Sequence, residues 1–446
     1  MQLSVTNINF KHRISQFIFL ILLLSLYYLT NRAESTQLLA LFFGLFTVYL
    51  YFLKSNSNLE WLNFGLICRA SLLFALPNLS DDFYRFLWDG HLINQGINPF
   101  NFLPSQAISS LEQSEWNNSL LNNMNSPEYF TLYPPLNQWI FSLGALTQNT
   151  FWGVFIFKII LLGFDFGNYW IIKKILVRFS KPTNWANLYW LNPLIILEGV
   201  GNVHFEIMML FFFLSSTYYL ATIKDQYGGL SFTFSILSKM FILMMAPLTL
   251  LKLGWHRSIR VIPIMISVFL LSFLPFINWN NIGNMMGSIN LYFQKFEFNS
   301  GIYSVIKYIG FNTVGYDVIQ LWGPILAIIS TLIILVISFN YRYRNRLVLF
   351  TGYQYIFITY LLFSPIGHPW YLIIPIALSV FTKKLTPIIW SAFIFLSYTT
   401  YGNVNFEENS TLLIIEYTLV FTFLIIDVFG DNYKKIALLK ASIFSS

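Results

Sequence analysis

The sequence predicts an all-α protein, a polytopic bundle of transmembrane helices, and three observations predict it. Only 10% of the residues are charged and 56% are hydrophobic, whereas about a quarter of a soluble domain is charged. Apolar runs of about 15 to 23 residues recur along the chain, and such runs can cross a hydrocarbon core of about 30 Å. Lysine and arginine gather in short clusters between these runs. This pattern excludes a soluble domain.

The apolar runs predict about twelve full crossings and one re-entrant or short-helix pair. The first run follows Lys11 and Arg13, and no small-residue cleavage site follows it. We therefore expect a retained span rather than a signal peptide. The predicted spans are residues 14–31, 36–53, 59–78, 151–172, 185–199, 206–223, 258–278, 321–339, 347–364, 369–382, 386–401 and 411–429.

The spans predict one integral membrane domain over residues 1–446, because the chain shows no internal repeat and no soluble insertion. N-terminal spans occupy residues 1–58 and C-terminal spans occupy 383–446. Between them lies a core at 59–382, which contains a long outer loop at 79–150. We expect this loop to carry short helices next to the membrane.

The net charge of +7 is a topology signal, because the basic clusters alternate with spans as the positive-inside rule predicts. Both chain ends are therefore expected in the cytoplasm, and membrane lipids are the expected surroundings. No basic face indicates nucleic acid. Cys68 is the one cysteine and lies in an apolar run, which excludes a disulfide framework and a thiolate metal site.

One stretch breaks the alternation of sides. The segments "KDQYGG" at 224–229 and "KLGWHRSIR" at 252–260 are both expected inside, yet a single apolar stretch separates them. Two ends on the same side need an even number of crossings, which a helix pair that turns near Ser238 and Lys239 provides. Such a break is tolerated in a membrane only where it is buried in protein or lines a cavity. Lys239 is then a candidate functional cation. The alternative is one ordinary span with a weak charge signal.

The topology places several polar segments on the outer side, where we expect them to form one cavity. The carboxylates Asp81 and Asp82 open the outer loop, directly after an apolar run. Aromatic members can stack on a sugar or line the membrane interface. The remaining candidate substrate-binding residues are Arg85, Asp89, His91, Tyr133, His204, Glu206, Lys239, Glu297, Asn299, His368, Trp370 and Tyr371.

The first of these segments predicts a helix over residues 80–95. Ser80 can cap it, Asp81 and Asp82 stand in its first turn, and Gly96 ends it together with Pro99. Arg85 is four residues from Asp81 and from Asp89, so these three share a face. The two adjacent carboxylates either serve chemistry or act only as a cap and charge tether.

Carboxylates and cations in one outer site fit the transfer of a sugar to a hydroxyl group. A partly desolvated carboxylate can remove the proton of the acceptor hydroxyl, and Asp81 or Asp82 is the candidate. A phosphate leaving group needs cations, for which Arg85 and Lys239 are the candidates. The sequence indicates no definite cofactor. A divalent metal is an open alternative, with ligands from among Asp81, His91, His204 and His368.

Six segments carry a resemblance to a known enzyme class. The chain resembles the GT-C class of integral membrane glycosyltransferases, in particular the bacterial polyprenol-phosphate-mannose-dependent mannosyltransferase-like branch. The similarity runs in order from about residue 77 to 382. The segments are "DDFYRFLWDGHLINQGINPF", "YPPLNQ", "LNPLIILEGVGNVHFEIMML", "SKMFILMMAPL", "FEFNSGIY" and "HPWYLIIP".

The resemblance implies an enzyme of the bacterial inner membrane that works on its extracytoplasmic side. It implies a polyprenyl-phosphate sugar donor, with mannose the expected sugar, a lipid or glycan hydroxyl acceptor, and a direct inverting displacement. The early acidic residue of the class falls on Asp81 or Asp82. Apart from the resemblance, His368 joins Arg85 and Lys239 as a candidate phosphate ligand.

The chain departs from that class at two points. Val203-His204-Phe205-Glu206 replaces a Gly-His-Asn-Asp-like run. The class usually places its acidic residue after the first span, whereas this chain has two extra N-terminal spans before that position. A transporter or flippase for lipid-linked or small polar solutes is the alternative function. Such a protein is expected to show two related halves and a polar site near the middle of the membrane. The sequence shows neither of these features.

Overall fold

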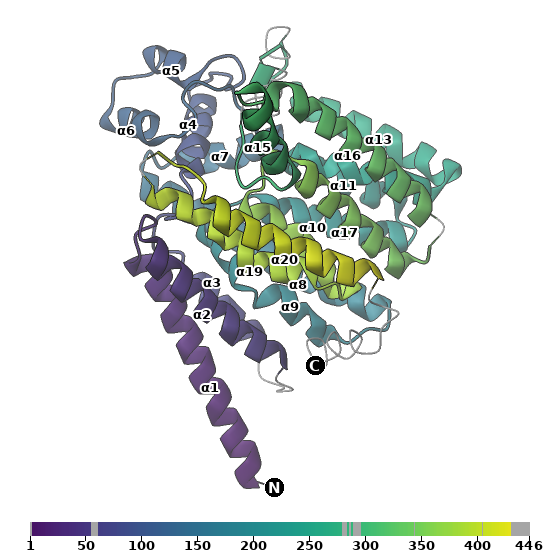
Figure 1. Ribbon diagram of the computed structural model, residues 1–446. Coiled ribbons are helices and arrows are strands. Elements are labelled where there is room, and N and C mark those ends of the chain that lie inside the picture. Colours follow the sequence, from purple (N-terminus) through teal and green to yellow (C-terminus); the bar gives the residue numbers. More distant parts are fainter. Residues whose placement is uncertain are drawn as a thin grey trace. The chain divides into compact units, whose positions relative to one another are not determined.

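The computed structural model describes residues 2–54, 61–278, 283–284, 287–288, 296–342, 344–403 and 405–429. These residues form helices joined by short turns, and the described part of the chain contains no β-strand, only one isolated bridge between Phe298 and Ile366 (Figure 1). The prediction of an all-α protein is confirmed. The expected basic tail at 431–435 lies outside the described residues.

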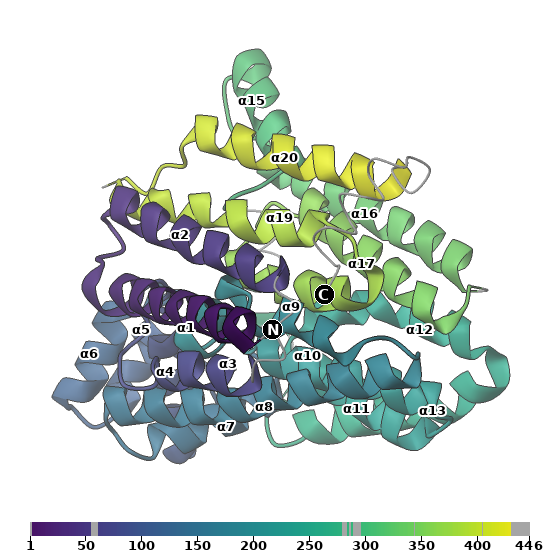
Figure 2. The same cartoon turned by 90° about the horizontal axis from the view of Figure 1, so that it is seen from below.

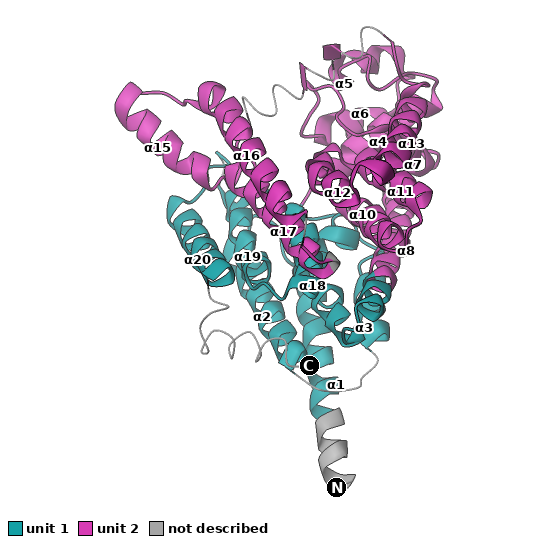
Figure 3. Cartoon of the chain, turned by 90° about the vertical axis from the view of Figure 1, so that its right-hand side faces the viewer, with its two compact units in different colours: residues 1–79, 172–202, 368–446 teal, residues 80–171, 203–367 magenta. Residues whose placement is uncertain are grey.

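The chain divides into two compact units, each built from separate stretches of sequence (Figure 3). Unit 1 comprises residues 1–79, 172–202 and 368–446. Within it, α1 lies beside α2 and α19 lies beside α20 (Figure 2). The helices of unit 1 are α1 (Gln2–Leu24), η1 (Ser25–Leu29), α2 (Ser35–Lys54), α3 (Trp61–Ala70), η3 (Thr183–Ala186), α9 (Asn187–Trp190), η4 (Ile195–Gly201), η6 (Pro369–Leu372), α18 (Ile373–Thr382), α19 (Thr386–Phe393), η7 (Ile394–Gly402) and α20 (Ser410–Phe429).

Unit 2 comprises residues 80–171 and 203–367. Within it, α11 packs against α10 and α13, and α16 lies beside α17 (Figure 2). Its helices are α4 (Asp82–Asn94), α5 (Pro104–Ala107), η2 (Ile108–Ser110), α6 (Glu115–Asn123), α7 (Pro135–Ala145), most of α8 (Thr150–Arg178), α10 (Glu206–Ala221), α11 (Asp225–Ser238), η5 (Met240–Met245), α12 (Ala246–Leu253), α13 (Trp255–Phe273), α15 (Ile302–Val314), α16 (Ile319–Tyr341) and α17 (Arg346–Phe363). The single-domain boundaries stay a prediction.

The protein is an integral membrane protein with several spanning helices. Six helices within the described ranges are long and apolar enough to cross a bilayer, and a bent pair formed by η4 and α10 would make a seventh. The six are Phe10–Leu29, Ser35–Lys54, Thr150–Arg178, Trp255–Phe273, Ile319–Tyr341 and Ser410–Phe429. Several other apolar runs form shorter helices, such as Leu347–Phe363 and Pro369–Thr382, which explains why the number is lower than the twelve apolar runs.

The helix break predicted near Ser238 and Lys239 is present in the structure. Helix α11 ends at Ser238, Lys239 is extended with φ −154° and ψ 121°, and η5 begins at Met240. The last carbonyls of a helix need partners from outside it. Asn137 of α7 donates its side-chain amide to the Ser238 carbonyl at 2.9 Å, which stabilises the break.

Helix α4 runs from Asp82 to Asn94, close to the predicted range 80–95, but Asp81 rather than Ser80 is its N-cap residue. The Ser80 hydroxyl accepts a hydrogen bond from the Asp82 amide at 3.3 Å, and Asp81 occupies the N-cap position. After Asn94 the chain turns through Gly96, whose φ of +72° suits glycine. Local sequence therefore presents Asp82 in the first turn, beside the positive end of the helix dipole.

Gly90 allows α4 and α7 to pack closely. A Cβ atom at this position would lie 2.1 Å from the Phe141 carbonyl oxygen of α7, which is a backbone atom and cannot rotate away. We expect Gly90→Ala to destabilise the fold by about 1–3 kcal/mol through overpacking. Thermal unfolding of the purified protein measures this.

The matched control is Gly163→Ala in α8, where a Cβ atom would meet nothing within 4 Å. This control is expected to unfold at the wild-type temperature or slightly above it, because alanine is the better helix former. Equal unfolding temperatures for the two variants would contradict the close packing at Gly90.

Candidate active site

An aromatic cluster forms the floor of the candidate site in unit 2. Phe86 of α4 stacks on Phe141 of α7, with ring centroids 4.6 Å apart and planes at 9°. Phe205, directly before α10, packs edge-on against both rings. Tyr133 also packs edge-on against both. The cluster therefore fixes Tyr133, the first turn of α10 and the α4–α7 pair relative to one another.

Asp82 is a partly exposed carboxylate with two polar partners. The Asn125 amide donates to Asp82 Oδ1 at 3.2 Å, and the Tyr133 hydroxyl donates to Asp82 Oδ2 at 3.4 Å. Both partners are neutral, and no ion pair of this carboxylate is present among the described residues. Asp81 is also partly exposed. The arrangement suits Asp82 to accept a proton from a bound hydroxyl.

The Tyr133 ring lies next to a buried ion pair between Lys239 and Glu206. The Lys239 ammonium lies 3.1 Å from Glu206 Oε1 and 5.0 Å from the centroid of the Tyr133 ring. The Glu206 side chain is fully buried, whereas that of Lys239 is 17% exposed. Tyr133 therefore contacts Asp82 through its hydroxyl group and Lys239 through its ring.

The surroundings of Tyr133 keep its phenol protonated. Burial raises the pKa of Tyr133 well above its usual value, and the nearby carboxylates of Asp82 and Glu206 raise it further. A phenol with such a pKa is a hydrogen-bond donor across the physiological pH range. Tyr133 is therefore suited to hold the Asp82 carboxylate rather than to act as a base.

We expect Tyr133→Phe to lower the catalytic turnover about threefold to tenfold. This is the effect of losing one hydrogen bond worth about 0.5–1.5 kcal/mol, because the 3.4 Å contact with Asp82 is long. The phenyl ring keeps its packing on Phe86 and Phe141, so the fold is preserved. Turnover measured at matched protein levels tests this. A loss as large as that caused by removing the Asp82 carboxylate would contradict a supporting role.

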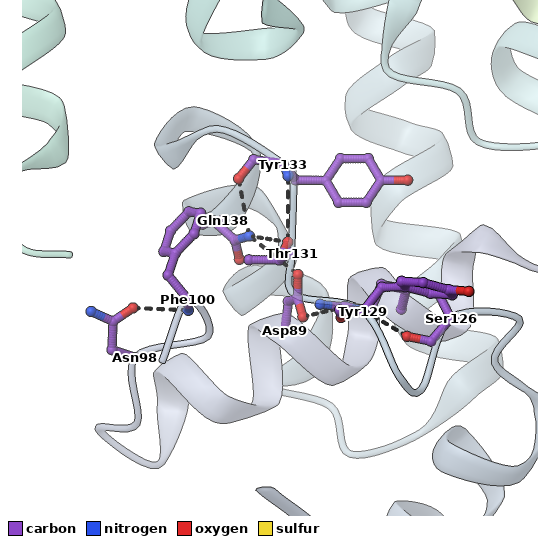
Figure 4. Close-up of polar contacts among 9 residues, drawn as sticks. Asp89, Asn98, Phe100, Ser126, Tyr129, Thr131, Tyr133 and Gln138 are labelled. Carbon is purple, nitrogen blue, oxygen red and sulfur yellow. Dashed lines mark hydrogen bonds and ion pairs between the residues drawn. The ribbon is translucent and has the colours of Figure 1, made fainter. Parts of the chain in front are cut away.

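A second network, centred on Arg85 and Asp89, positions the loop that carries Tyr133 (Figure 4). Arg85 Nε donates to Asp89 Oδ1 at 2.7 Å, and its Nη1 donates to the carbonyls of Ser126 and Tyr129 at 3.0 and 2.8 Å. Both side chains are buried. The helix face predicted for Arg85 and Asp89 is confirmed by this contact.

Gln138 extends this network to Tyr133 (Figure 4). Its side-chain amide lies 3.2 Å from Asp89 Oδ2, 3.1 Å from Thr131 Oγ1 and 3.2 Å from the Tyr133 carbonyl. The network thus ties α4, α7 and the intervening loop together. In this structure Arg85 acts on the site through the loop, and its predicted contact with phosphate stays a prediction.

Two histidines of unit 2, His91 and His204, were predicted to bind substrate, and both are buried. His91 packs edge-on against Trp116 at 5.0 Å, and burial lowers its pKa, which favours the neutral imidazole. His204 precedes Phe205 and Glu206 and is 1% exposed. Their predicted contacts with substrate stay predictions.

The segment that contains Glu297 and Asn299 packs against residues 365–367, which directly precede His368. Phe298 forms a parallel bridge with Ile366, and the Gly367 amide donates to the Phe298 carbonyl at 2.7 Å. Asn299 is buried with φ +47° and donates to the Gly367 carbonyl at 3.4 Å. Glu297 pairs with Lys307 of α15. Within unit 2, residues 297–299 and residues 365–367 therefore lie together.

His368, Trp370 and Tyr371 belong to unit 1. The His368 ring stacks on Trp370 with centroids 4.2 Å apart, and Tyr371 packs edge-on against it at 5.4 Å. Both aromatic residues are buried. The prediction that these three side chains share a site with Asp82 and Lys239 is not tested by the structure of either unit.

The described ranges contain no cluster of side chains that could bind a metal ion. No three His, Cys, Asp or Glu side chains among those residues lie close enough together to hold an ion. The four side chains proposed for a metal, Asp81, His91, His204 and His368, thus form no such group there.

Three residues of the site were not singled out from the sequence. They are Asn125, which holds Asp82, and Asn137 and Gln138, which hold the α11 break and the Tyr133 loop. Asn137 and Gln138 lie in the segment "YPPLNQ". Two adjacent amide side chains shortly after two prolines were the sequence pattern that could have indicated them as site residues. Asn125 lies in an asparagine-rich loop that offers no such signal.

A family comparison covers the residues of this site. The family model for the alpha-(1->6)-mannopyranosyltransferase N-terminal domain matches residues 19–255. This range is more than half of the chain and includes Asp82, Tyr133, Glu206 and Lys239. The chain belongs to the alpha-(1->6)-mannopyranosyltransferase family. The resemblance to a mannosyltransferase family is therefore confirmed.

One curated relative agrees with this membership of the mannopyranosyltransferase family. The chain is similar to alpha-(1->6)-mannopyranosyltransferase A of Corynebacterium glutamicum, with 29% identity over 149 residues. The alignment covers 31% of this chain and 27% of that relative. The chain thus matches about a quarter of the length of this curated relative.

Proposed function

We propose that the chain is a GT-C-type glycosyltransferase that moves mannose from a polyprenyl-phosphate donor to a hydroxyl group of a lipid or glycan. The transfer takes place at the extracytoplasmic face by direct displacement, with inversion at the anomeric carbon. Family membership supports the mannosyl group. The observation that carries the chemistry is the position of Tyr133, which contacts Asp82 by its hydroxyl and Lys239 by its ring.

This geometry supports a base and a cation in one small site. Asp82 is the proposed base, because it is partly exposed and its side-chain partners within the described ranges, Asn125 and Tyr133, are neutral. Asp81 is the alternative, one residue earlier at the N-cap. Lys239 is the proposed phosphate ligand, because its ammonium is held in place and part of its side chain is exposed.

The proposed reaction conserves atoms and charge. The acceptor oxygen forms a bond to the anomeric carbon of the sugar while the bond from that carbon to the phosphate oxygen breaks. The acceptor proton passes to the Asp82 carboxylate. The departing polyprenyl phosphate takes the bonding electron pair, and Lys239 stabilises the negative charge that grows on it.

The remaining residues support these two groups. Arg85, Asp89 and Gln138 hold the loop that positions Tyr133. We keep Glu297, Asn299, His368, Trp370 and Tyr371 as proposed contacts to donor or acceptor. Aromatic rings such as those of Trp370 and Tyr371 suit the apolar face of a sugar or a polyprenyl chain.

The proposal is tested by a transfer assay in membranes that contain the protein. Polyprenyl-phosphate mannose and polyprenyl-phosphate glucose, each radiolabelled in the sugar, are supplied with the native lipid and glycan acceptors. We expect label from the mannose donor in a glycan or glycolipid product, with less label from the glucose donor. Membranes without the protein are the control. The absence of transfer from either donor would refute the proposal.

A further inference from the structure

The ion pair between Lys239 and Glu206 leaves the lysine with a neutralised charge. In the described part of the chain, Glu206 is the one acid within ion-pair distance of the Lys239 ammonium. The second oxygen of Glu206, Oε2, is buried and has no hydrogen-bond partner among the described residues. The carboxylate therefore depends on Lys239 for its electrostatic compensation, as a buried charge requires a partner.

A phosphate bound to Lys239 would lie close to Glu206. A hydrogen bond to the ammonium is about 2.8 Å long, and the ammonium is 3.1 Å from Glu206 Oε1. The phosphate oxygen thus lies within about 6 Å of a second negative charge. At this separation near a protein surface, the repulsion between two unit charges corresponds to at least about tenfold in binding constant.

We propose that Glu206 is a built-in counter-ion that weakens the binding of the polyprenyl phosphate product to Lys239 and so promotes its release. This inference rests on the proposed role of Lys239 as the phosphate ligand. Glu206 stands in the first turn of α10, where a negative charge meets the positive end of the helix dipole. Glu206 is thus a positioning residue that acts through Lys239.

Such a counter-ion helps because Lys239 must stabilise the phosphate charge in the transition state but must not hold the phosphate product tightly. A cation that binds the free phosphate tightly slows product release, which limits turnover in many enzymes. The buried carboxylate lowers the affinity of Lys239 for the product phosphate, and the ammonium still has donors for the charge that develops during displacement.

The test measures the binding of a short-chain polyprenyl phosphate to the purified full chain in detergent. We expect Glu206→Gln to bind this phosphate about tenfold more tightly than the wild type. Binding of the matching polyprenyl alcohol is expected to stay unchanged. In turnover assays the same variant should show a lower KM for the donor, stronger inhibition by the phosphate product and a lower kcat.

Two variants separate charge from damage to the fold. Glu206→Asp keeps the negative charge, so its phosphate affinity should stay near that of the wild type. Asp225→Asn is the matched control, because it removes the acid of the Asp225–Arg257 ion pair at the other end of α11. That end is about 20 Å away along the 14-residue helix. Its phosphate affinity should be unchanged.

The outcomes distinguish this inference from the function on which it rests. If Lys239→Met leaves phosphate binding unchanged, Lys239 is not the phosphate ligand and the proposed site is wrong. If Lys239→Met abolishes the binding but Glu206→Gln binds no more tightly than the wild type, the counter-ion role alone is wrong. Equal weakening in Glu206→Gln and Glu206→Asp would also overturn it, because that result indicates a structural role only.

Discussion

Asp82→Asn is expected to lower mannosyl transfer about 100- to 10,000-fold, the range over which a general base contributes to catalysis. The amide has the shape of the carboxylate and can still accept hydrogen bonds from Asn125 and Tyr133. It cannot take up the acceptor proton. The loss should therefore fall on kcat rather than on the KM for the donor, and the radiolabel assay measures both.

Asp81→Asn is the paired control for this experiment. Asp81 is the N-cap residue of α4, one position before Asp82, and its side chain does not cap the helix. We expect Asp81→Asn to retain most of the transfer activity. If an expressed and folded Asp82→Asn protein were fully active, Asp82 would not be the base. Loss of activity in Asp81→Asn alone would assign that role to Asp81.

Lys239→Met should lower kcat/KM about 100- to 1,000-fold, the size of effect seen when a group that stabilises developing charge is removed. Methionine keeps the apolar stem but removes the ammonium that faces Glu206 and the Tyr133 ring. Lys239→Arg retains the charge and should recover part of the activity. Steady-state kinetics at matched protein levels measure these differences.

Lys239→Met has a side effect that its control must remove. The variant leaves the buried Glu206 carboxylate without its cation, and such a loss typically costs about 3–5 kcal/mol. The double variant Lys239→Met with Glu206→Gln replaces both charges, so its unfolding temperature should recover. Its transfer activity should stay low. Recovery of activity together with stability would show that Lys239 has a structural role only.

Much of the fold class could be predicted from local sequence. Long apolar runs are spans because backbone groups in hydrocarbon must be bonded within the helix, and the helices Phe10–Leu29, Ser35–Lys54 and Ile319–Tyr341 show this. The break at Ser238–Lys239 was predictable because basic clusters on either side required it. The start of α4 at Asp82 followed from Ser80 and the adjacent carboxylates.

The partners of the site residues were not predictable, because they come from distant segments. Arg85 was a candidate phosphate ligand, yet its guanidinium donates hydrogen bonds to Asp89 and to the carbonyls of Ser126 and Tyr129. These two carbonyls lie more than 40 positions further along the chain. Asp427 gives a similar example in unit 1. Its carboxylate accepts from the amides of Leu385 and Thr386, more than 40 positions earlier in the chain, and so caps α19.

By itself, the sequence determined that this is a multi-span membrane protein of a mannosyltransferase type, with carboxylates after an early span and a lysine at a helix break. The spans, the carboxylates and the helix break depend on hydropathy, charge alternation and local capping, which neighbouring residues decide, whereas the mannosyltransferase type came from the resemblance to a known family. Only the tertiary structure decided that Tyr133 lies between Asp82 and Lys239 and that Glu206 neutralises the lysine. Contacts between residues far apart in sequence depend on how α4, α7, α10 and α11 pack, and no local pattern specifies that packing.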